Sequence, residues 1–252
     1  MTEYLKRDGL PDLAYIHTQG QNTDLPLVMF LPGFRSDMGG TKAVFLEDRA
    51  KQREQAFLRF DYSGHGISGG DFEDGTISQW AQDALSVLDH VSKGQKSVLV
   101  GSSMGGWIGL IMALARPDSV TGYVGIAAAP DFTDDMYNNR MNEEQRTLLN
   151  EQGHIDVPNE YSDEPYRISK ALIDDGQSNR LLSNGIDMNM PVRLVQGMQD
   201  ADVEWQHSHR IKNAMTGDDV EVLLIKDGDH RLSRPQDLEI IDDSVKAVSG
   251  IT

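Results

Sequence analysis

The sequence has no cysteine among its 252 residues, which excludes disulfides, thiolate metal sites and a cysteine nucleophile. It also lacks a membrane span, because its longest apolar stretch, residues 98–115, is interrupted by glycines and serines. The opening residues MTEYLKRDG lack the basic and then apolar organisation of a secretory signal, and no mitochondrial transit sequence is evident. These absences favour a cytoplasmic protein without a membrane-spanning segment.

Basic residues are scarce in this chain. It has 23 Lys and Arg against 40 Asp and Glu, for a formal net charge of −17. The negative electrostatic potential of such a chain repels nucleic acid and anionic membrane surfaces, so we expect neither as a partner. The acids stand in scattered pairs, which is typical of a highly solvated surface; adaptation to a saline habitat is the alternative. We expect a small-molecule substrate instead, and the composition sets no oligomeric state.

Short apolar runs that end in turn residues recur along the chain, and such runs are typical of strands buried on both faces. They lie at Leu27–Leu31, Phe57–Phe60, Ser97–Val100, Val120–Ala129, Val192–Val195 and Val220–Ile225, after two short strands expected at Tyr4–Arg7 and Leu13–His17. Segments with helical periodicity, around residues 80–91, 108–115 and 240–248, alternate with them. The sequence therefore predicts a single α/β domain over residues 1–252, with a mostly parallel sheet and helices on both faces.

The segment from about residue 132 to residue 190 interrupts this alternation. It shows no clear strand, only two helix-like pieces at Met141–Gln152 and Ile168–Leu182. A segment of this length between strands is typically a functional insertion rather than a bare loop. We therefore expect it to form a small helical cap above the sheet.

Residues 101–105, Gly-Ser-Ser-Met-Gly, form a G-x-S-x-G pattern centred on Ser103. A buried-type strand leads into the pattern and a helix of small residues leads out, as in a nucleophile elbow. The glycines allow a tight turn that exposes the serine oxygen while neighbouring backbone passes closely. The following helix directs free N–H groups toward developing negative charge. The pattern predicts that Ser103, rather than Ser102, is a nucleophile.

A serine nucleophile needs a base, which in this fold follows the acid along the chain. Of the seven histidines, His207, His209 and His230 follow a plausible acid site near position 200. His207 and His209 fall in a helix-like stretch, and we expect both on its surface. His230 lies in a loop after Val220–Ile225, at the edge of the sheet where active residues gather. We therefore expect His230 to be the base.

Two aspartates compete for the acid that orients this base. Both follow the strand expected at Val192–Val195. Asp200 fits the G-x-x-D-x-x-V spacing that many hydrolases of this fold carry, whereas Asp202 does not. The carboxylate that is not the acid is expected to be solvated or to cap the following helix. We favour Asp200 as the acid.

A tetrahedral oxyanion needs N–H donors, and the backbone of Met104, directly after the nucleophile, is expected to supply one. The loop after Leu27–Leu31 is expected to supply the other, from Phe34. A metal site is not expected, because the sequence has neither H-E-x-x-H nor a histidine cluster. Glycine motifs typical of nucleotide binding are missing as well, so we expect no cofactor.

Several stretches are distinctive when they are taken together. They are Leu31-Pro32-Gly33-Phe34, Met38, Gly40-Thr41-Lys42-Ala43, Arg59-Phe60-Asp61-Tyr62-Ser63-Gly64, Gly101–Trp107, Ala115-Arg116-Pro117, Pro191-Val192-Arg193-Leu194, Gly197-Met198, Trp205 and Asp229-His230-Arg231. The set resembles the mitochondrial abhydrolase-domain family of palmitoyl-protein thioesterases and mycophenolic acid acyl-glucuronide esterases, over most of the chain. The resemblance implies cofactor-free hydrolysis of acyl thioesters or activated esters. By motif it assigns the nucleophile to Ser103, the acid to Asp200 and the base to His230.

The sequence thus predicts a serine hydrolase of the α/β-hydrolase fold that cleaves carboxylic esters or acyl thioesters through an acyl-enzyme. One alternative is other serine-dependent chemistry of this fold, namely a peptidase, a carbon–carbon hydrolase or an acyltransferase. The second alternative is a non-catalytic binding protein that kept the fold.

Overall fold

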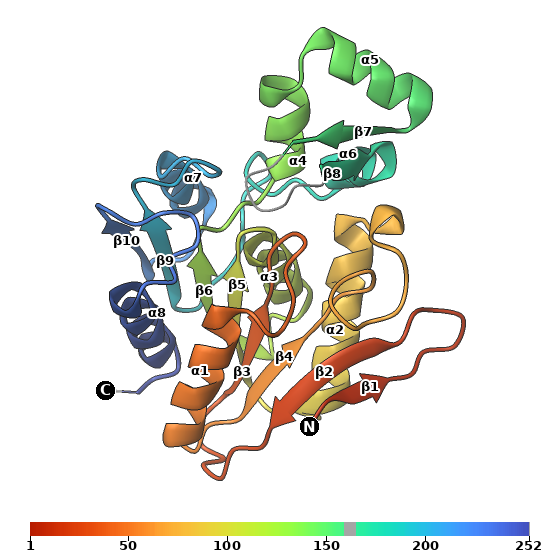
Figure 1. The fold of residues 1–252 in the computed structure, drawn as a ribbon. Coiled ribbons are helices and arrows are strands. Elements are labelled where there is room, and N and C mark those ends of the chain that lie inside the picture. Colours follow the sequence, from red (N-terminus) through yellow and green to blue (C-terminus); the bar gives the residue numbers. More distant parts are fainter. Residues whose placement is uncertain (159–164, 252) are drawn as a thin grey trace.

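The computed structural model describes residues 1–158 and 165–251. In this part of the chain, eight strands form one sheet in the order β1-β2-β4-β3-β5-β6-β9-β10 (Figure 1). The strands are β1 Glu3–Leu5, β2 Leu13–Thr18, β3 Leu27–Leu31, β4 Phe57–Phe60, β5 Ser97–Ser102, β6 Val120–Ile126, β9 Val192–Gly197 and β10 Val220–Ile225. All of the strands expected from apolar runs are therefore present. β6 ends before Ala127, because that residue adopts a left-handed backbone conformation (φ 44°).

The sheet is mostly parallel, as the sequence predicts. β1 pairs with β2, and β2 with β4, in antiparallel fashion. The remaining neighbours, from β4 through β3, β5, β6 and β9 to β10, are parallel. The carboxyl ends of these parallel strands meet at one edge, so the loops that follow them lie together.

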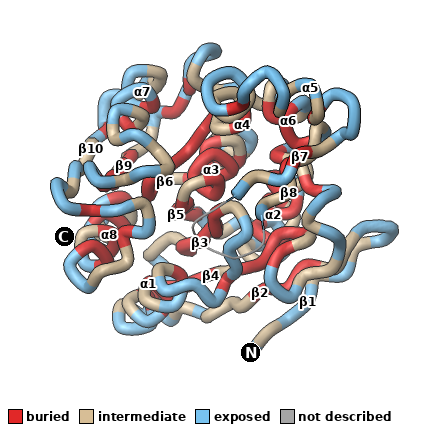
Figure 2. Tube along the Cα trace, turned by 45° about the horizontal axis from the view of Figure 1, so that its top comes forward, coloured by how far each residue is buried: buried red, intermediate tan, exposed pale blue. Residues whose placement is uncertain are grey.

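Helices cover both faces of the sheet, which is the arrangement of the predicted α/β class. β3 shows why, because its alternate residues belong to two different apolar clusters. Met29 and its neighbours pack with α2 (Ile77–Ser92), α3 (Met104–Ala115) and α7 (Gln206–Ala214). Val28 and Phe30 pack with α1 (Thr41–Gln52) and α8 (Pro235–Val248). Figure 2 accordingly shows buried residues along the central strands.

The segment between β6 and β9 lies beyond the carboxyl edge of the sheet (Figure 1). Its elements are α4 Phe132–Asp135, the π-helix η2 Met136–Arg140, α5 Glu143–Gln152, β7 His154–Val157, β8 Tyr166–Ser169 and α6 Lys170–Ser178. The expectation of no strand here is wrong, because β7 and β8 form an antiparallel pair. The helix expected from Ile168 begins only at Lys170, where the Ser169 side chain caps it. Residues 159–164 of the expected cap, like residue 252, lie outside the described residues.

A small apolar cluster of its own holds this segment together. Leu149 of α5, Ile155 of β7 and Ile168 of β8 are buried against one another. Each strand contributes only one buried residue, so the alternation is too short to be recognised in the sequence. Within residues 1–158 and 165–251, no helix combines the length and the apolar character that crossing a bilayer requires.

Candidate active site

Ser103 occupies a sharp turn between β5 and α3, with a φ of 55° and a ψ of −119°. The flanking glycines are needed because backbone passes close to both. A Cβ at Gly101 would lie 2.3 Å from the Gly105 carbonyl oxygen, and a Cβ at Gly105 would lie 2.1 Å from the Leu31 carbonyl oxygen. The G-x-S-x-G pattern therefore marks a close crossing of β5, α3 and β3 that holds a strained serine.

The structure brings Ser103, His230 and Asp200 together in one chain of hydrogen bonds. His230 Nδ1–H donates to Asp200 Oδ2 at 2.8 Å, because a carboxylate can only accept. This bond leaves the lone pair of His230 on Nε2, which lies 3.2 Å from Ser103 Oγ. The three residues come from loops after β5, β9 and β10, so the parallel strands deliver them to one edge.

The loop after β9 presents Asp200, rather than Asp202, to the histidine. The Asp200 side chain is fully buried, and its Oδ1 accepts the backbone N–H groups of Asp202 (2.9 Å) and Val203 (2.8 Å). Gln196 donates to Oδ2 at 2.9 Å. Burial alone would raise the pKa of Asp200, but the hydrogen bond and charge of His230, together with these N–H groups, lower it below the ordinary value. Asp200 is therefore a carboxylate whose acceptor positions are filled.

These hydrogen bonds also bear on metal binding. Within the described chain, Asp200, Asp202 and His230 each offer one potential ligand atom, and these three atoms lie within 4.8 Å of one another. The Asp200 oxygens accept N–H donors, and His230 Nδ1 donates to one of them. A cation would have to displace these protons, so the donor set suits an oriented imidazole better than a metal ion.

The two backbone donors expected for an oxyanion lie beside Ser103. Met104 begins α3, so its N–H has no acceptor within the helix. Phe34 follows β3, and a Cβ at the preceding Gly33 would lie 3.4 Å from the Ser103 Cβ. Neither N–H donates to another group among the described residues. Both residues line the same cleft as Ser103 and His230.

The Phe34 ring is anchored by other aromatic side chains rather than directed into solvent. It makes edge-to-face contacts with Phe72 (4.9 Å between centroids), Phe132 (5.9 Å), Tyr166 (5.9 Å) and Trp80 (6.0 Å). These partners come from η1 (Phe72–Asp74), α4, β8 and α2. The ring thus joins the loop after β3 to the inserted segment.

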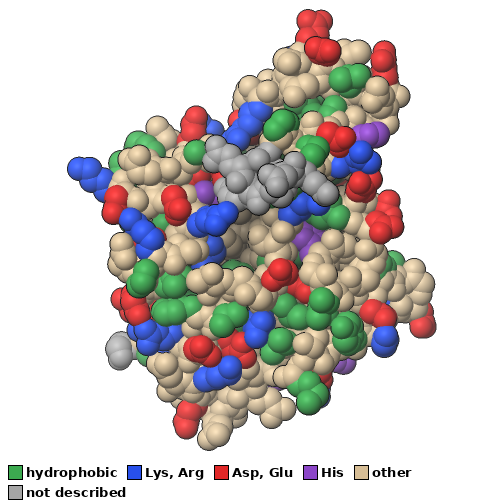
Figure 3. All heavy atoms as spheres, in the orientation of Figure 1, with side chains coloured by type: hydrophobic (Ala, Val, Ile, Leu, Met, Phe, Trp, Pro, Cys, Tyr) green, Lys and Arg blue, Asp and Glu red, His purple; other side chains and the backbone are tan. Residues whose placement is uncertain are grey.

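The cleft around Ser103 has a volume of about 970 Å³. The inserted segment contributes apolar lining from Phe132, Met136, Val157, Tyr166 and Ile168. Basic side chains line it as well, namely Arg35, Lys42, Arg140, Arg210 and Arg231. Figure 3 shows Lys and Arg side chains around the hollow below the inserted segment. The cleft therefore combines an apolar wall with a basic rim.

Of the two histidines expected on the surface of α7, only His209 is exposed. The expectation for His207 is wrong. Its Nε2–H donates to the Pro130 carbonyl oxygen at 3.0 Å, and the residue lines the cleft. Burial lowers the pKa of His207. The periodicity of a short helix gives no sign of this contact, because Pro130 lies far away along the chain.

Sequence reasoning also missed His65, in the loop after β4. Its side chain is only 4% exposed and lies between the rings of Phe72 (5.0 Å) and Trp80 (5.1 Å). The loop follows a parallel strand at the same edge as Ser103, and this position was the available signal. His65 Nε2 lies 3.3 Å from the backbone nitrogen of Arg35, the residue after Phe34.

Comparison with known proteins places the chain among characterised families. Residues 25–170 match the family model described as serine aminopeptidase, S33. Mouse mitochondrial palmitoyl-protein thioesterase ABHD10 is 39% identical over 253 residues, which cover 98% of this chain and 84% of the mouse protein. The crystal structure of a putative hydrolase from Agrobacterium vitis S4 has a TM-score of 0.94 at 42% identity, over 99% of this chain and 98% of that one.

The structure of mouse α/β hydrolase domain-containing protein 10 agrees, with a TM-score of 0.90 at 37% identity over 98% of this chain and 97% of that one. The family match spans more than half of the chain, and the similarity to the mouse thioesterase spans nearly all of it. The chain therefore belongs to the serine aminopeptidase S33 family of α/β hydrolases, and within it to the group that contains the ABHD10 proteins.

Proposed function

We propose that this enzyme hydrolyses carboxylic esters or acyl thioesters through a Ser103–His230–Asp200 triad and an acyl-enzyme. The observation that carries the proposal is the continuous hydrogen-bond chain from Ser103 Oγ to the buried Asp200 carboxylate. The names of the ABHD10 relatives, palmitoyl-protein thioesterases, support an acyl thioester as substrate. The apolar wall of the cleft supports an acyl chain in the same way.

In the proposed cycle, His230 Nε2 takes the proton of Ser103 as its Oγ attacks the acyl carbon. Asp200 holds the imidazole and stabilises its charged form. The oxyanion accepts the N–H groups of Phe34 and Met104. The carbon–oxygen or carbon–sulfur bond then breaks, and His230 gives its proton to the leaving alcohol or thiol. Water, activated by the same histidine, repeats the attack on the acyl-enzyme and releases the acid.

The inserted segment has a part in this proposal. We assign residues 132–190, as far as they are described, to a cap on a single hydrolase domain that spans residues 1–252. Met136 of η2 and Ile168 of β8 line the cleft from this side. The cap would therefore form the wall against which the acyl chain lies.

A peptidase is the second candidate, because the matching family is described as serine aminopeptidase. An aminopeptidase must bind a substrate ammonium, which usually takes a carboxylate partner. Basic side chains outnumber acidic ones by five to three among the described residues that line the cleft, which favours the ester and thioester reading. A panel of matched ester, thioester and aminoacyl-amide substrates tests this, and preferential cleavage of the amides would contradict the first candidate.

A fluorophosphonate probe tests the triad directly. The wild-type protein should be labelled, and Ser103→Ala should not. Ser102→Ala is the matched control, because it removes the neighbouring hydroxyl of the same motif and should leave labelling intact. Equal labelling of wild type and Ser103→Ala would overturn the catalytic role of Ser103 and favour a non-catalytic binding protein.

The cellular location is a separate proposal. We infer a cytoplasmic enzyme from the sequence, whereas the names of the ABHD10 relatives describe them as mitochondrial. Fractionation of the native cells with antibodies against the chain distinguishes the two locations.

A further inference from the structure

The loop after β4 supplies a histidine that the proposed cycle does not use. Ser63 and His65 lie in this loop, and Asp61 fixes where it begins. The Asp61 carboxylate accepts the backbone N–H groups of Met38 (2.7 Å) and Ile67 (2.9 Å). Met38 belongs to the loop after β3, so one buried carboxylate holds the two loops side by side.

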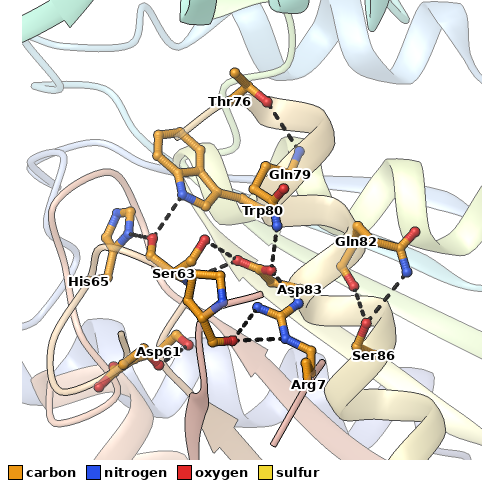
Figure 4. Close-up of polar contacts among 12 residues, drawn as sticks. Arg7, Asp61, Ser63, His65, Thr76, Gln79, Trp80, Gln82, Asp83 and Ser86 are labelled. Atoms are coloured by element: carbon orange, nitrogen blue, oxygen red, sulfur yellow. Dashed lines mark hydrogen bonds and ion pairs between the residues drawn. The ribbon is translucent and has the colours of Figure 1, made fainter. Parts of the chain in front are cut away.

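Hydrogen bonds fix which nitrogen of His65 carries the proton. His65 Nδ1 lies 3.2 Å from the Ser63 carbonyl oxygen, which can only accept, so Nδ1 is the donor. Trp80 Nε1–H donates to the same oxygen at 3.1 Å (Figure 4). In the neutral ring Nε2 then has a lone pair, and it accepts the Arg35 backbone N–H at 3.3 Å. His65 is therefore an acceptor for the main chain of the loop after β3.

A buried network holds the other end of His65 in place. The Asp83 side chain of α2 is fully buried and accepts Ser63 N–H (2.8 Å), the Ser63 hydroxyl (2.5 Å), Gln79 (2.8 Å) and Arg7 (2.7 Å) (Figure 4). Ser63 therefore cannot move without breaking its two hydrogen bonds to the Asp83 carboxylate. The imidazole is fixed against a rigid carbonyl on one side and against Arg35 on the other.

Arg35 needs such a partner. Its φ of 53° is a left-handed conformation that a residue with a Cβ adopts at a cost of about 1 kcal/mol or more. The peptide bond that contains the Arg35 N–H also contains the Phe34 carbonyl, so holding this peptide plane restricts rotation about ψ of Phe34. The Gly33 carbonyl, which shares a peptide plane with the Phe34 N–H, accepts the Ser36 N–H at 3.0 Å, so the two contacts together limit where the Phe34 N–H points. The Phe34 N–H is one of the two proposed oxyanion donors.

We propose that His65 is a positioning residue for the oxyanion hole: its neutral Nδ1–H tautomer holds the Arg35 N–H and thereby aims the Phe34 N–H at the developing oxyanion. The proposal rests on the proposed function. His65 touches neither substrate nor Ser103 in this arrangement and acts only through the main chain. Burial, the largest influence, lowers the pKa of His65 to about 4, with Arg35 acting in the same direction and the Ser63 carbonyl and Asp83 opposing it. The ring is therefore neutral, as an acceptor must be, at physiological pH.

Two substitutions separate the two nitrogens of the ring. His65→Asn retains an amide N–H near Nδ1 for the Ser63 carbonyl but has no atom at the position of Nε2. His65→Gln is longer, and its amide oxygen reaches toward the Arg35 N–H. We expect His65→Asn to lower kcat by about 10- to 100-fold, since loss of a whole oxyanion donor costs about 10²–10³-fold. KM should change by less than about twofold, and His65→Gln should recover most of the lost kcat.

A trifluoromethyl ketone that forms a tetrahedral adduct with serine provides the second readout. Its inhibition constant should rise in His65→Asn in proportion to the loss of kcat/KM, because both depend on the oxyanion donors. A simple loss of folding would instead lower the active fraction without changing this constant, and thermal melting would register it. An unchanged inhibition constant in His65→Asn, or equal losses in His65→Asn and His65→Gln, would overturn the positioning role. Activity that survives Ser103→Ala would instead overturn the proposed function. Failure of the His65 positioning role and failure of the proposed triad are therefore distinguished by different variants.

Discussion

Asp200 and Asp202 are two positions apart, yet their surroundings give them different tasks. Asp200 accepts the imidazole N–H of His230, whereas the backbone of Asp202 donates to Asp200. Asp200→Asn should therefore lower kcat by about 10³–10⁴-fold, because the amide favours the wrong imidazole tautomer. Asp202→Asn, the matched control, should change kcat by less than about tenfold. Steady-state kinetics on one activated ester checks both variants, and comparable losses would contradict the assignment of the acid.

Protonation of His65 should contribute to the loss of folding stability at acid pH. Its pKa falls from an ordinary 6.5 to about 4 in the folded chain, chiefly through burial. As pH falls below 6.5, His65 becomes protonated in the unfolded chain while it stays neutral in the folded chain. The stabilising contribution is thus complete above pH 6.5 and is lost as pH falls toward 4.

Urea unfolding measures this effect directly. The free energy of unfolding should decrease between about pH 7 and about pH 5, and the decrease should be smaller in His65→Asn, which has no imidazole to protonate. His209→Asn is the control for the substitution itself, because it makes the same change at an exposed histidine. Equal pH dependence in wild type and His65→Asn would show that other groups are responsible.

At the scale of elements, β3, β4, β5, β6, β9 and β10 were predictable because each is a compact run of apolar residues closed by a turn. α1 was not expected, since only Ala43, Leu46, Glu47 and Ala50 of its residues are buried and no strong apolar stripe appears. The β7–β8 pair was missed because four-residue strands are too short to show alternation. Pairing between distant segments is a tertiary property that local patterns do not encode.

The residues of the candidate site also fall into those that local sequence patterns predict and those that they do not. Ser103, Asp200 and His230 follow the chain order of this fold and lie in recognisable local motifs, so the sequence pattern predicts them. The bond from Arg35 to His65 Nε2 joins residues 30 positions apart, and the contact from His207 to Pro130 spans 77. Neither contact has a local motif. The residues of the proposed triad were therefore predictable, while the buried histidine contacts around the site were not.

The cap elements should control the length of the acyl chain. Met136 of η2 is half-buried and lines the cleft on the apolar side. Met136→Trp adds volume there, so kcat/KM should fall by about tenfold or more for a sixteen-carbon acyl ester and by less than about twofold for a four-carbon ester. Thr147→Trp on exposed α5 is the control and should leave the profile unchanged. A uniform loss at all chain lengths would place the acyl chain elsewhere.

Across the whole molecule, the charge of the cleft opposes the charge of the chain. The protein carries a formal charge of −17, yet bases exceed acids among the described residues of the cleft. Lys42 is the instructive case. Its Nζ donates to the Arg231 carbonyl, directly after His230, and it forms no ion pair within residues 1–158 and 165–251. Since we propose that His230 protonates the leaving group, we place Lys42 on the leaving-group side.

Lys42→Gln should therefore lower kcat/KM by about 3- to 10-fold for an ester whose leaving alcohol carries a carboxylate, and hardly at all for its neutral amide analogue. Added salt should reduce the same preference in the wild type. Lys42→Arg keeps the charge and should retain the selectivity. Equal losses on both substrates would mean that Lys42 acts only by holding the Arg231 loop.

The edge-to-face contact between Trp80 and His65, at 5.1 Å, has an optical consequence. A protonated imidazole beside an indole quenches its emission, whereas a neutral one does so much less. Trp80 is one of three tryptophans, so replacing Trp107 and Trp205 by Phe would leave a single fluorophore beside this histidine. The emission of such a protein should dim on acidification with the midpoint of His65 itself. The state of the loop that aims Phe34 would then be visible in solution, without substrate and without a label.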